Sequence, residues 1–562
     1  MRRGPTVFLL LILLAAAAYG SYRAMDVAWT RVVEFAPSYL SAQKPTAGPS
    51  PLAAKVVLVV ADGLRPNDAA LLPAVDWLEQ RGAVYALSAP LPSYQVPVTA
   101  TLLTGAPAEL HGVLLPQSSG PLAYDSLLTA ARRARLTSGG VGGQVLGKLV
   151  ASGLDQWQPA DTPDQVVTAA RGLMAANGPN LTVVQLTHMY ANDQKVRSHS
   201  ISDPEYVKLM AEADGALVRL LDVIDWKTTA VVLVGTLPDQ PGHPLPLVMA
   251  GAGVKPGVRG QASLLDVAPT VSALLGAPMP FGSQGKPLMG ALAVTGRPAD
   301  VVIQRAMEAR KAYADALLLS IGSAEKAAAV PEAAAEFDRY TAELDQQVKS
   351  ARFAVWKQSL VDQLPYLGGA LLVLLLYVIV VWRQPFGGTA FLSTLLYGGV
   401  FHGTFVAVGG RYSAALAGLE QFTWQALLRY GLAAAGAMAL ASLLAGYLLS
   451  RKGFKKKRYL GGATLHMALS TAALIALPIV IALAFVGWEF PVVLPSAGLL
   501  VWFFATGLQV LVIGALSPLW LMLAVNTARA ANALWPLPES GDPERNADKE
   551  ARARTLRRAV KR

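Results

Sequence analysis

Apolar residues in this chain gather in runs of two lengths, which predict two kinds of element. In the N-terminal half the runs are short: Val56–Val60 leads into Asp62 and Gly63, and Ala230–Val234 leads into another glycine. Short apolar runs bounded by turn residues are typical of strands that are buried on both faces. The first of these strands places Asp62 at its C-terminal end, which is the edge of an open α/β sheet where ligands bind.

The C-terminal half carries apolar stretches that are long enough to cross a membrane, which takes about 20 residues. We predict five spans there, at 364–382, 390–408, 431–449, 465–486 and 498–525. A further apolar run, Val7–Tyr19, follows two arginines near the N-terminus, and we interpret it as an uncleaved anchor rather than a signal peptide. A mean hydropathy of +0.40 and a charged fraction of 15% agree with a membrane protein.

The net charge of +11 is explained by the positions of the basic residues relative to these spans. With six spans, the basic segments at 2–3, 383, 451–458 and 557–562 all fall on one side. The positive-inside rule makes that side cytoplasmic, with both termini, and places residues 21–362 outside the cell membrane. Because the basic runs flank spans and lack interleaved aromatic residues, they favour contact with membrane lipid over binding of nucleic acid.

The chain contains no cysteine. This excludes disulfides and cysteine-based zinc or redox sites. An exported domain without disulfides depends on its hydrophobic core for stability.

Several motifs follow Asp62 in a fixed order along the N-terminal half. They are the segment 92–105 (PSYQVPVTATLLTG), His111-Gly-Val, Asp193 with a later Ser-Asp-Pro-Glu-Tyr, Gly242-His243 and the segment 265–276 (LDVAPTVSALLG). In this order they resemble the alkaline phosphatase superfamily, in particular its phosphodiesterase and GPI-ethanolamine-phosphate-transferase branches. The resemblance covers about residues 55–288. It implies an α/β fold, namely an alkaline-phosphatase-like domain with a mostly parallel central sheet, here joined to an α-helical transmembrane bundle.

The resemblance also implies ancestral chemistry on phosphoester head groups, in which two close divalent metals activate a Ser or Thr nucleophile. The matched nucleophile position, three residues after Pro92, is Gln95. An amide has no ionisable hydroxyl group and cannot form a covalent phospho-enzyme. Ser93 and Thr99 remain alternative nucleophiles, although both lie off the matched position.

The matched metal-ligand positions are also depleted. Those that keep a ligand are Asp62, Asp193 and His243, and those that have lost one are Arg197, Thr236 and Leu237. A guanidinium cannot ligate a metal, so Arg197 is interpreted instead as an internal cation that pairs with Asp193 and Asp62. Neither site keeps the three protein ligands that catalytic zinc requires. We therefore expect no bound cofactor; if the chain is active, it holds two divalent metals, zinc or manganese, and His199 is the residue that could restore a site.

These observations predict six segments with different roles. They are an N-terminal membrane anchor (1–24), a linker (25–54), the alkaline-phosphatase-like extracytoplasmic domain (55–297), a helical hairpin or stalk broken near Pro331 (298–362), a five-span bundle (363–528) and a basic cytoplasmic tail (529–562). The function that the residues favour is that of a pseudoenzyme, acting as scaffold or accessory subunit of a larger membrane protein complex. The alternative is an active metal-dependent phosphodiesterase or phosphoethanolamine transferase with rearranged ligands.

Overall fold

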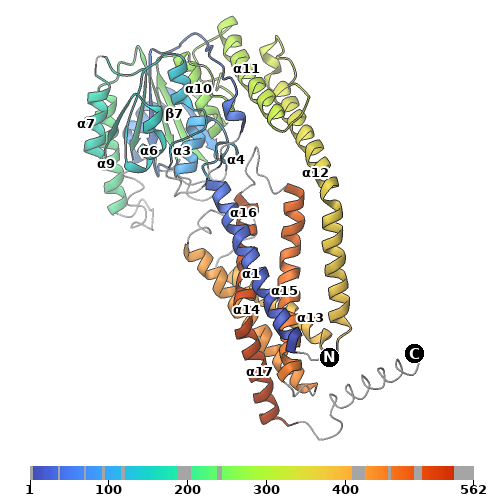
Figure 1. The fold of residues 1–562 in the computed structure, drawn as a ribbon. Helices are drawn as coiled ribbons and strands as arrows, with labels where there is room; N and C mark the ends of the chain where they lie inside the picture. The colour runs from blue at the N-terminus through green and yellow to red at the C-terminus, as the bar shows by residue number, and fades with distance from the viewer. Residues whose placement is uncertain are drawn as a thin grey trace. The chain divides into compact units, whose positions relative to one another are not determined.

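A computed structural model of the chain describes residues 4–33, 35, 38–66, 68, 71–90, 95–114, 120–175, 177–186, 204–236, 244–407, 424–452, 457–486 and 497–536. The chain forms two compact units. The globular unit comprises residues 32–357 with 490–497, and the helical unit comprises 1–31, 358–489 and 498–562. Each is described separately below (Figure 1).

The centre of the globular unit is an eight-stranded sheet with the strand order β4-β3-β5-β1-β6-β7-β2-β8. Its strands are β1 (Lys55–Ala61), β2 (Gly82–Ser88), β3 (Ser138–Gly142), β4 (Gln156–Pro159), β5 (Leu181–Leu186), β6 (Thr229–Gly235), β7 (Leu245–Gly251) and β8 (Val258–Ser263). The neighbouring pairs are parallel except those made by β7, which is antiparallel to both β6 and β2. The predicted mostly parallel α/β sheet is confirmed.

Both faces of the sheet are covered by helices, which explains why its central strands are apolar at most positions. Along β1, Val56, Leu58 and Val60 face one core while Val57 and Val59 face the other. The first core is completed by α3 (Gln95–Thr104), α5 (Leu127–Arg133), α6 (Gln144–Val150), α10 (Val267–Leu275) and α11 (Arg297–Ser320). The second is completed by α2 (Pro73–Glu79), α7 (Pro163–Leu173) and α9 (Pro204–Leu221); Figure 1 shows α7 and α9 together beside the sheet.

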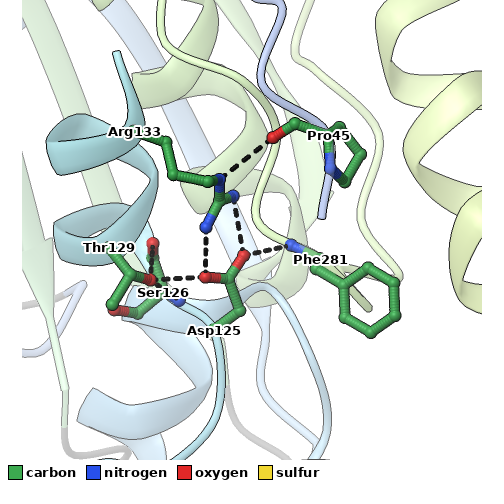
Figure 2. Close-up of polar contacts among 6 residues, drawn as sticks. All are labelled: Pro45, Asp125, Ser126, Thr129, Arg133 and Phe281. Atoms are coloured by element: carbon green, nitrogen blue, oxygen red, sulfur yellow. Dashed lines mark hydrogen bonds and ion pairs between the residues drawn. The ribbon is translucent and has the colours of Figure 1, made fainter. Parts of the chain in front are cut away.

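The segment before β1 is fastened to the globular unit rather than loose. The backbone N–H groups of Leu52 and Ala53 donate to the carbonyl of Leu274 at the end of α10. Further back, Arg133 on α5 donates from Nε to the carbonyl of Pro45 and pairs with Asp125 (Figure 2). A Cβ on Gly48 would lie 2.0 Å from the carbonyl oxygen of Gly276, so only glycine permits this approach.

Two helices flank the loop that contains Pro331. The first is α11 and the second is α12 (Phe337–Trp382). Helix α12 continues without a break for 46 residues and passes through Pro365, so it begins in the globular unit and ends in the helical unit.

The helical unit is built from long apolar helices. Besides the end of α12 they are α1 (Gly4–Val33), α13 (Gly387–Ala407), α14 (Trp424–Arg451), α15 (Lys457–Val486), α16 (Ala497–Ala515) and α17 (Ser517–Leu534). Within the described residues, four helices are long and apolar enough to cross a membrane, or five if one bent pair counts as a single span. Small residues allow close packing: a Cβ on Gly446 of α14 would lie 2.3 Å from the carbonyl of Ala524 on α17.

The bent pair corrects one sequence prediction. The stretch 498–525 was expected to form one long span, but α16 and α17 meet there at an angle of 60°. The break is at Leu516 and Ser517, directly before Pro518. Proline lacks an N–H group and favours the first turn of a new helix over the interior of an old one.

Candidate functional site

Asp62 lies directly after β1, where the parallel strands β5, β1 and β6 end side by side. Its side chain is fully buried, with 0% of its surface exposed. A carboxyl group at this edge of an α/β sheet is positioned for ligand chemistry. What it can do there depends on its neighbours.

Three neutral side chains donate hydrogen bonds to the Asp62 carboxylate. Nε2 of Gln95 and Nε2 of Gln185 each lie 2.5 Å from Oδ2, and Oγ1 of Thr236 lies 2.5 Å from Oδ1. Gln95 is the first residue of α3, Gln185 belongs to β5, and Thr236 follows β6. We call these three residues the neutral cage of Asp62.

The orientation of the Gln185 amide is fixed by a second contact. The backbone N–H of Gly143, which precedes α6, donates to Oε1 of Gln185 at 3.2 Å. The amide nitrogen is therefore the atom that faces Asp62. Gln185 is 1% exposed and lies opposite Val60 in the pairing of β5 with β1.

Burial controls the protonation of Asp62. Removal from water raises its pKa from about 3.8 to about 6, although the three hydrogen bonds act in the opposite direction. These bonds come from neutral groups, which stabilise a carboxylate less than a metal or a guanidinium would. Asp62 therefore takes up a proton at a higher pH, about 6, than an exposed aspartate does.

Two of the predicted site positions, Gln95 and Thr236, contact Asp62. Asp193, Arg197, His199, Leu237, His243 and Ser93 lie outside the described residues, and so does the predicted pairing of Arg197 with Asp62. Thr99 is 2% exposed, and its hydroxyl donates to the carbonyl of Gln95 at 2.7 Å within α3.

Sequence reasoning missed Gln185. The signal that could have found it is a glutamine within Leu181–Leu186, a strand buried along its whole length. Because a buried amide needs partners, a polar residue in such a strand next to β1 points toward Asp62.

Among the residues that the structure describes, the groups that contact Asp62 do not fit a divalent metal. A metal needs lone pairs from several ligands, whereas the two glutamines and Thr236 direct hydrogen atoms at Asp62. The oxygen of Gln185 is already used by Gly143. Across the part of the chain that the structure describes, no group of three or more His, Asp or Glu side chains could hold a metal ion.

No protein-family model and no curated protein matches the sequence. Solved structures that match include a protein of the alkaline phosphatase superfamily from Vibrio parahaemolyticus, at 16% identity and a TM-score of 0.37 over 50% of this chain and 78% of that chain. A 2-O GAG sulfatase matches at 13% identity and a TM-score of 0.36, over 42% of this chain and 73% of that chain. Murine ectonucleotide pyrophosphatase/phosphodiesterase 5 matches at 12% identity and a TM-score of 0.34, over 40% of this chain and 95% of that chain. The structural neighbours are thus members of the superfamily that the motif order resembles, and at these identities the likeness concerns fold alone.

Proposed function

We propose that this chain is a membrane-anchored protein of the alkaline phosphatase superfamily that has lost phosphoester catalysis and serves as a scaffold or accessory subunit of a membrane complex. The observation that carries the proposal is the neutral cage of Asp62. In the superfamily mechanism, the corresponding space holds a hydroxyl nucleophile and a metal. Here Gln95, which cannot form a covalent intermediate, occupies the nucleophile position and donates to the carboxylate.

The cage also explains how the fold could keep Asp62 after losing a metal. A buried carboxylate without partners is strongly destabilising. Three donors from α3, β5 and β6 satisfy its oxygens and join the ends of these elements. Asp62 then has a structural use that does not require catalysis.

The membrane part of the proposal rests on the apolar helices of the helical unit and on the basic residues beside them. Under the positive-inside rule the globular unit is extracytoplasmic and both termini are cytoplasmic. Contacts with lipid and with a larger protein complex belong to this proposal.

The first test measures metal content and turnover of the full-length protein in detergent. After incubation with zinc and manganese and removal of free metal, elemental analysis should find well below one ion per chain. Hydrolysis of bis(p-nitrophenyl) phosphate should not exceed that of Asp62→Ala. The repair variant Gln95→Thr should remain inactive, because a hydroxyl without metals is not activated.

The alternative, an active metal-dependent phosphodiesterase or phosphoethanolamine transferase, makes the opposite prediction. One or two ions per chain, lost in Asp62→Ala or Asp193→Ala together with turnover, would overturn the pseudoenzyme proposal. His199→Ala would then be the next variant to measure. The scaffold role is tested separately: after mild solubilisation the native assembly should have a mass well above that of the 59.2 kDa chain with its detergent.

A further inference from the structure

The globular unit contains a second candidate site, away from Asp62. A cavity of about 430 Å³ lies among α4 (Ala108–His111), α11 and the N-terminal part of α12. None of the neutral-cage residues lines it. Its volume falls within the range of small-molecule sites.

The unusual feature of this cavity is Arg310 on α11. Arg310 is 5% exposed and lines the cavity. Its Nη2 donates to Oδ1 of Asp345 at 2.6 Å, while its Nη1 is buried and, among the described residues, has no hydrogen-bond partner. Buried polar groups are almost always paired, and a buried cationic donor that is left unpaired costs free energy. An acceptor supplied by a ligand would remove that cost.

The other charges around the cavity favour an anion. Lys349 and Arg352 follow Asp345 on the same side of α12, because residues three and four apart share a helix face. With Arg310 they make three cations against two acids, Asp345 and Glu109, which leaves a formal charge of +1.

The rest of the lining is mainly apolar. It includes Leu110, Leu317, Leu344 and Val348, with the ring of Tyr313. Tyr313 and Leu317 belong to a buried cluster that continues into the unit's interior. Such a wall is suited to an alkyl chain rather than to a hydrated ion.

We propose that this cavity binds an amphipathic anion. Its phosphate or carboxylate would accept from Nη1 of Arg310, and its alkyl chain would lie against Leu110, Leu317 and Leu344. The source that fits both parts is a single-chain acidic lipid. The site is independent of whether the region around Asp62 catalyses a reaction.

The test is calorimetric titration of the full-length protein in phosphatidylcholine nanodiscs with three probes. Hexyl phosphate carries both features, inorganic phosphate carries only the anion, and hexanol carries only the chain. Hexyl phosphate should bind at least about tenfold more tightly than either of the others, the effect of one charge-assisted hydrogen bond or of several buried methylenes. In Arg310→Gln this binding should weaken about tenfold or more.

Arg310→Gln should fold, because its partner Asp345 is 66% exposed in the side chain and can be hydrated. Asp345→Asn provides a second, opposite readout: it removes the carboxylate that competes for Arg310 and should tighten binding of hexyl phosphate several-fold. Arg339→Gln is the matched control, since Arg339 also lies on α12 but is exposed, pairs with Glu336 and does not line the cavity. Equal binding of hexyl phosphate and inorganic phosphate, equal binding by Arg310→Gln and the unmodified chain, or no binding of hexyl phosphate at millimolar concentration would each overturn the proposal.

Discussion

At the scale of single residues, Asp62 is a carboxyl group whose three side-chain partners within the described ranges are neutral. The folded state binds a proton there more tightly than the unfolded chain does, because burial raises the pKa to about 6. Stability and proton binding are therefore linked at this residue. A shift of about two pKa units corresponds to about 3 kcal/mol.

This linkage predicts a pH dependence with a definite sign. Because the folded pKa is raised, the stabilising contribution is fully present below about pH 4 and is lost as the pH rises through about 6. Asp62→Asn mimics the protonated acid: its amide oxygen can accept from the two glutamines, and its amide nitrogen can donate to Thr236. We expect this variant to lose the fall in thermal midpoint between pH 4 and pH 7 and to be more stable than the unmodified chain at pH 7.

The measurement is the thermal unfolding midpoint of the full chain in nanodiscs at several pH values. Asp222→Asn is the control, since Asp222 is an exposed carboxylate of the same unit. Parallel curves for Asp62→Asn and the unmodified chain would show that Asp62 does not titrate as its burial implies.

The site could be predicted only in part because motifs and contacts carry different information. Gln95 and Thr236 were found because the motifs that resemble the alkaline phosphatase superfamily match them to a nucleophile position and a metal-ligand position. Gln185 lies far along the chain from Asp62, and the pairing of β5 with β1 brings the two together. Only the order of strands in the sheet shows that contact, and sequence periodicity does not determine strand order.

At the scale of elements, the segment before β1 is held by a mostly buried ion pair between Asp125, just before α5, and Arg133 at its end (Figure 2). Asp125, whose side chain is 1% exposed, accepts from both terminal nitrogens of Arg133, from the hydroxyl of Thr129 and from the backbone N–H of Phe281. The remaining guanidinium nitrogen, Nε, donates to the carbonyl of Pro45. The pair of Arg133 and Asp125 thus joins three segments that are distant in sequence, around Pro45, α5 and Phe281.

Removing this arginine should be strongly destabilising. Arg133→Met leaves Asp125 buried without its cation, and breaking a mostly buried pair from one side costs about 3–5 kcal/mol. The double variant Arg133→Met/Asp125→Asn should recover part of that loss, because no unpaired charge remains. The quantity to measure is the free energy of unfolding of the globular unit, obtained from a denaturant titration.

Arg132→Met is the matched control for this prediction. Arg132 is the neighbouring residue on α5, but it is exposed, and within the described part of the chain it donates to the carbonyls of Ser152 and Gly153. Its loss should cost no more than about 1 kcal/mol, as expected for exposed polar contacts. Equal losses for Arg132→Met and Arg133→Met would contradict the role assigned to the buried pair.

The predictability of the elements follows the strength of their local signals. Strands β1 and β6 could be located from sequence because both are continuous apolar runs that end at glycine turns. The bend between α16 and α17 was missed because hydropathy continues smoothly across Leu516, although Pro518 was a visible signal. The antiparallel direction of β7 is set by tertiary pairing with β6 and β2, for which its sequence gives no cue.

At the scale of the whole molecule, the chain combines a globular α/β unit with a unit of long apolar helices. The basic residues follow the helices in a regular way: Arg383 comes after α12, and Arg451 with Lys452 ends α14. If both sites are cytoplasmic, the segment between them crosses the membrane an even number of times, which α13 and α14 satisfy. In the topology that we propose, the span predicted at 364–382, in the end of α12, separates the globular unit from both basic sites.

The absence of cysteine allows this topology to be tested directly, because any introduced thiol is the only one in the chain. Glu325→Cys places a thiol on an exposed loop of the globular unit, and Arg383→Cys and Lys452→Cys place one beside each predicted cytoplasmic helix end. In intact cells a membrane-impermeant maleimide should label Glu325→Cys and leave the other two unlabelled until the membrane is permeabilised. Labelling of Lys452→Cys in intact cells would contradict the six-span arrangement. If Glu325→Cys were labelled only after permeabilisation, the globular unit would lie in the cytoplasm.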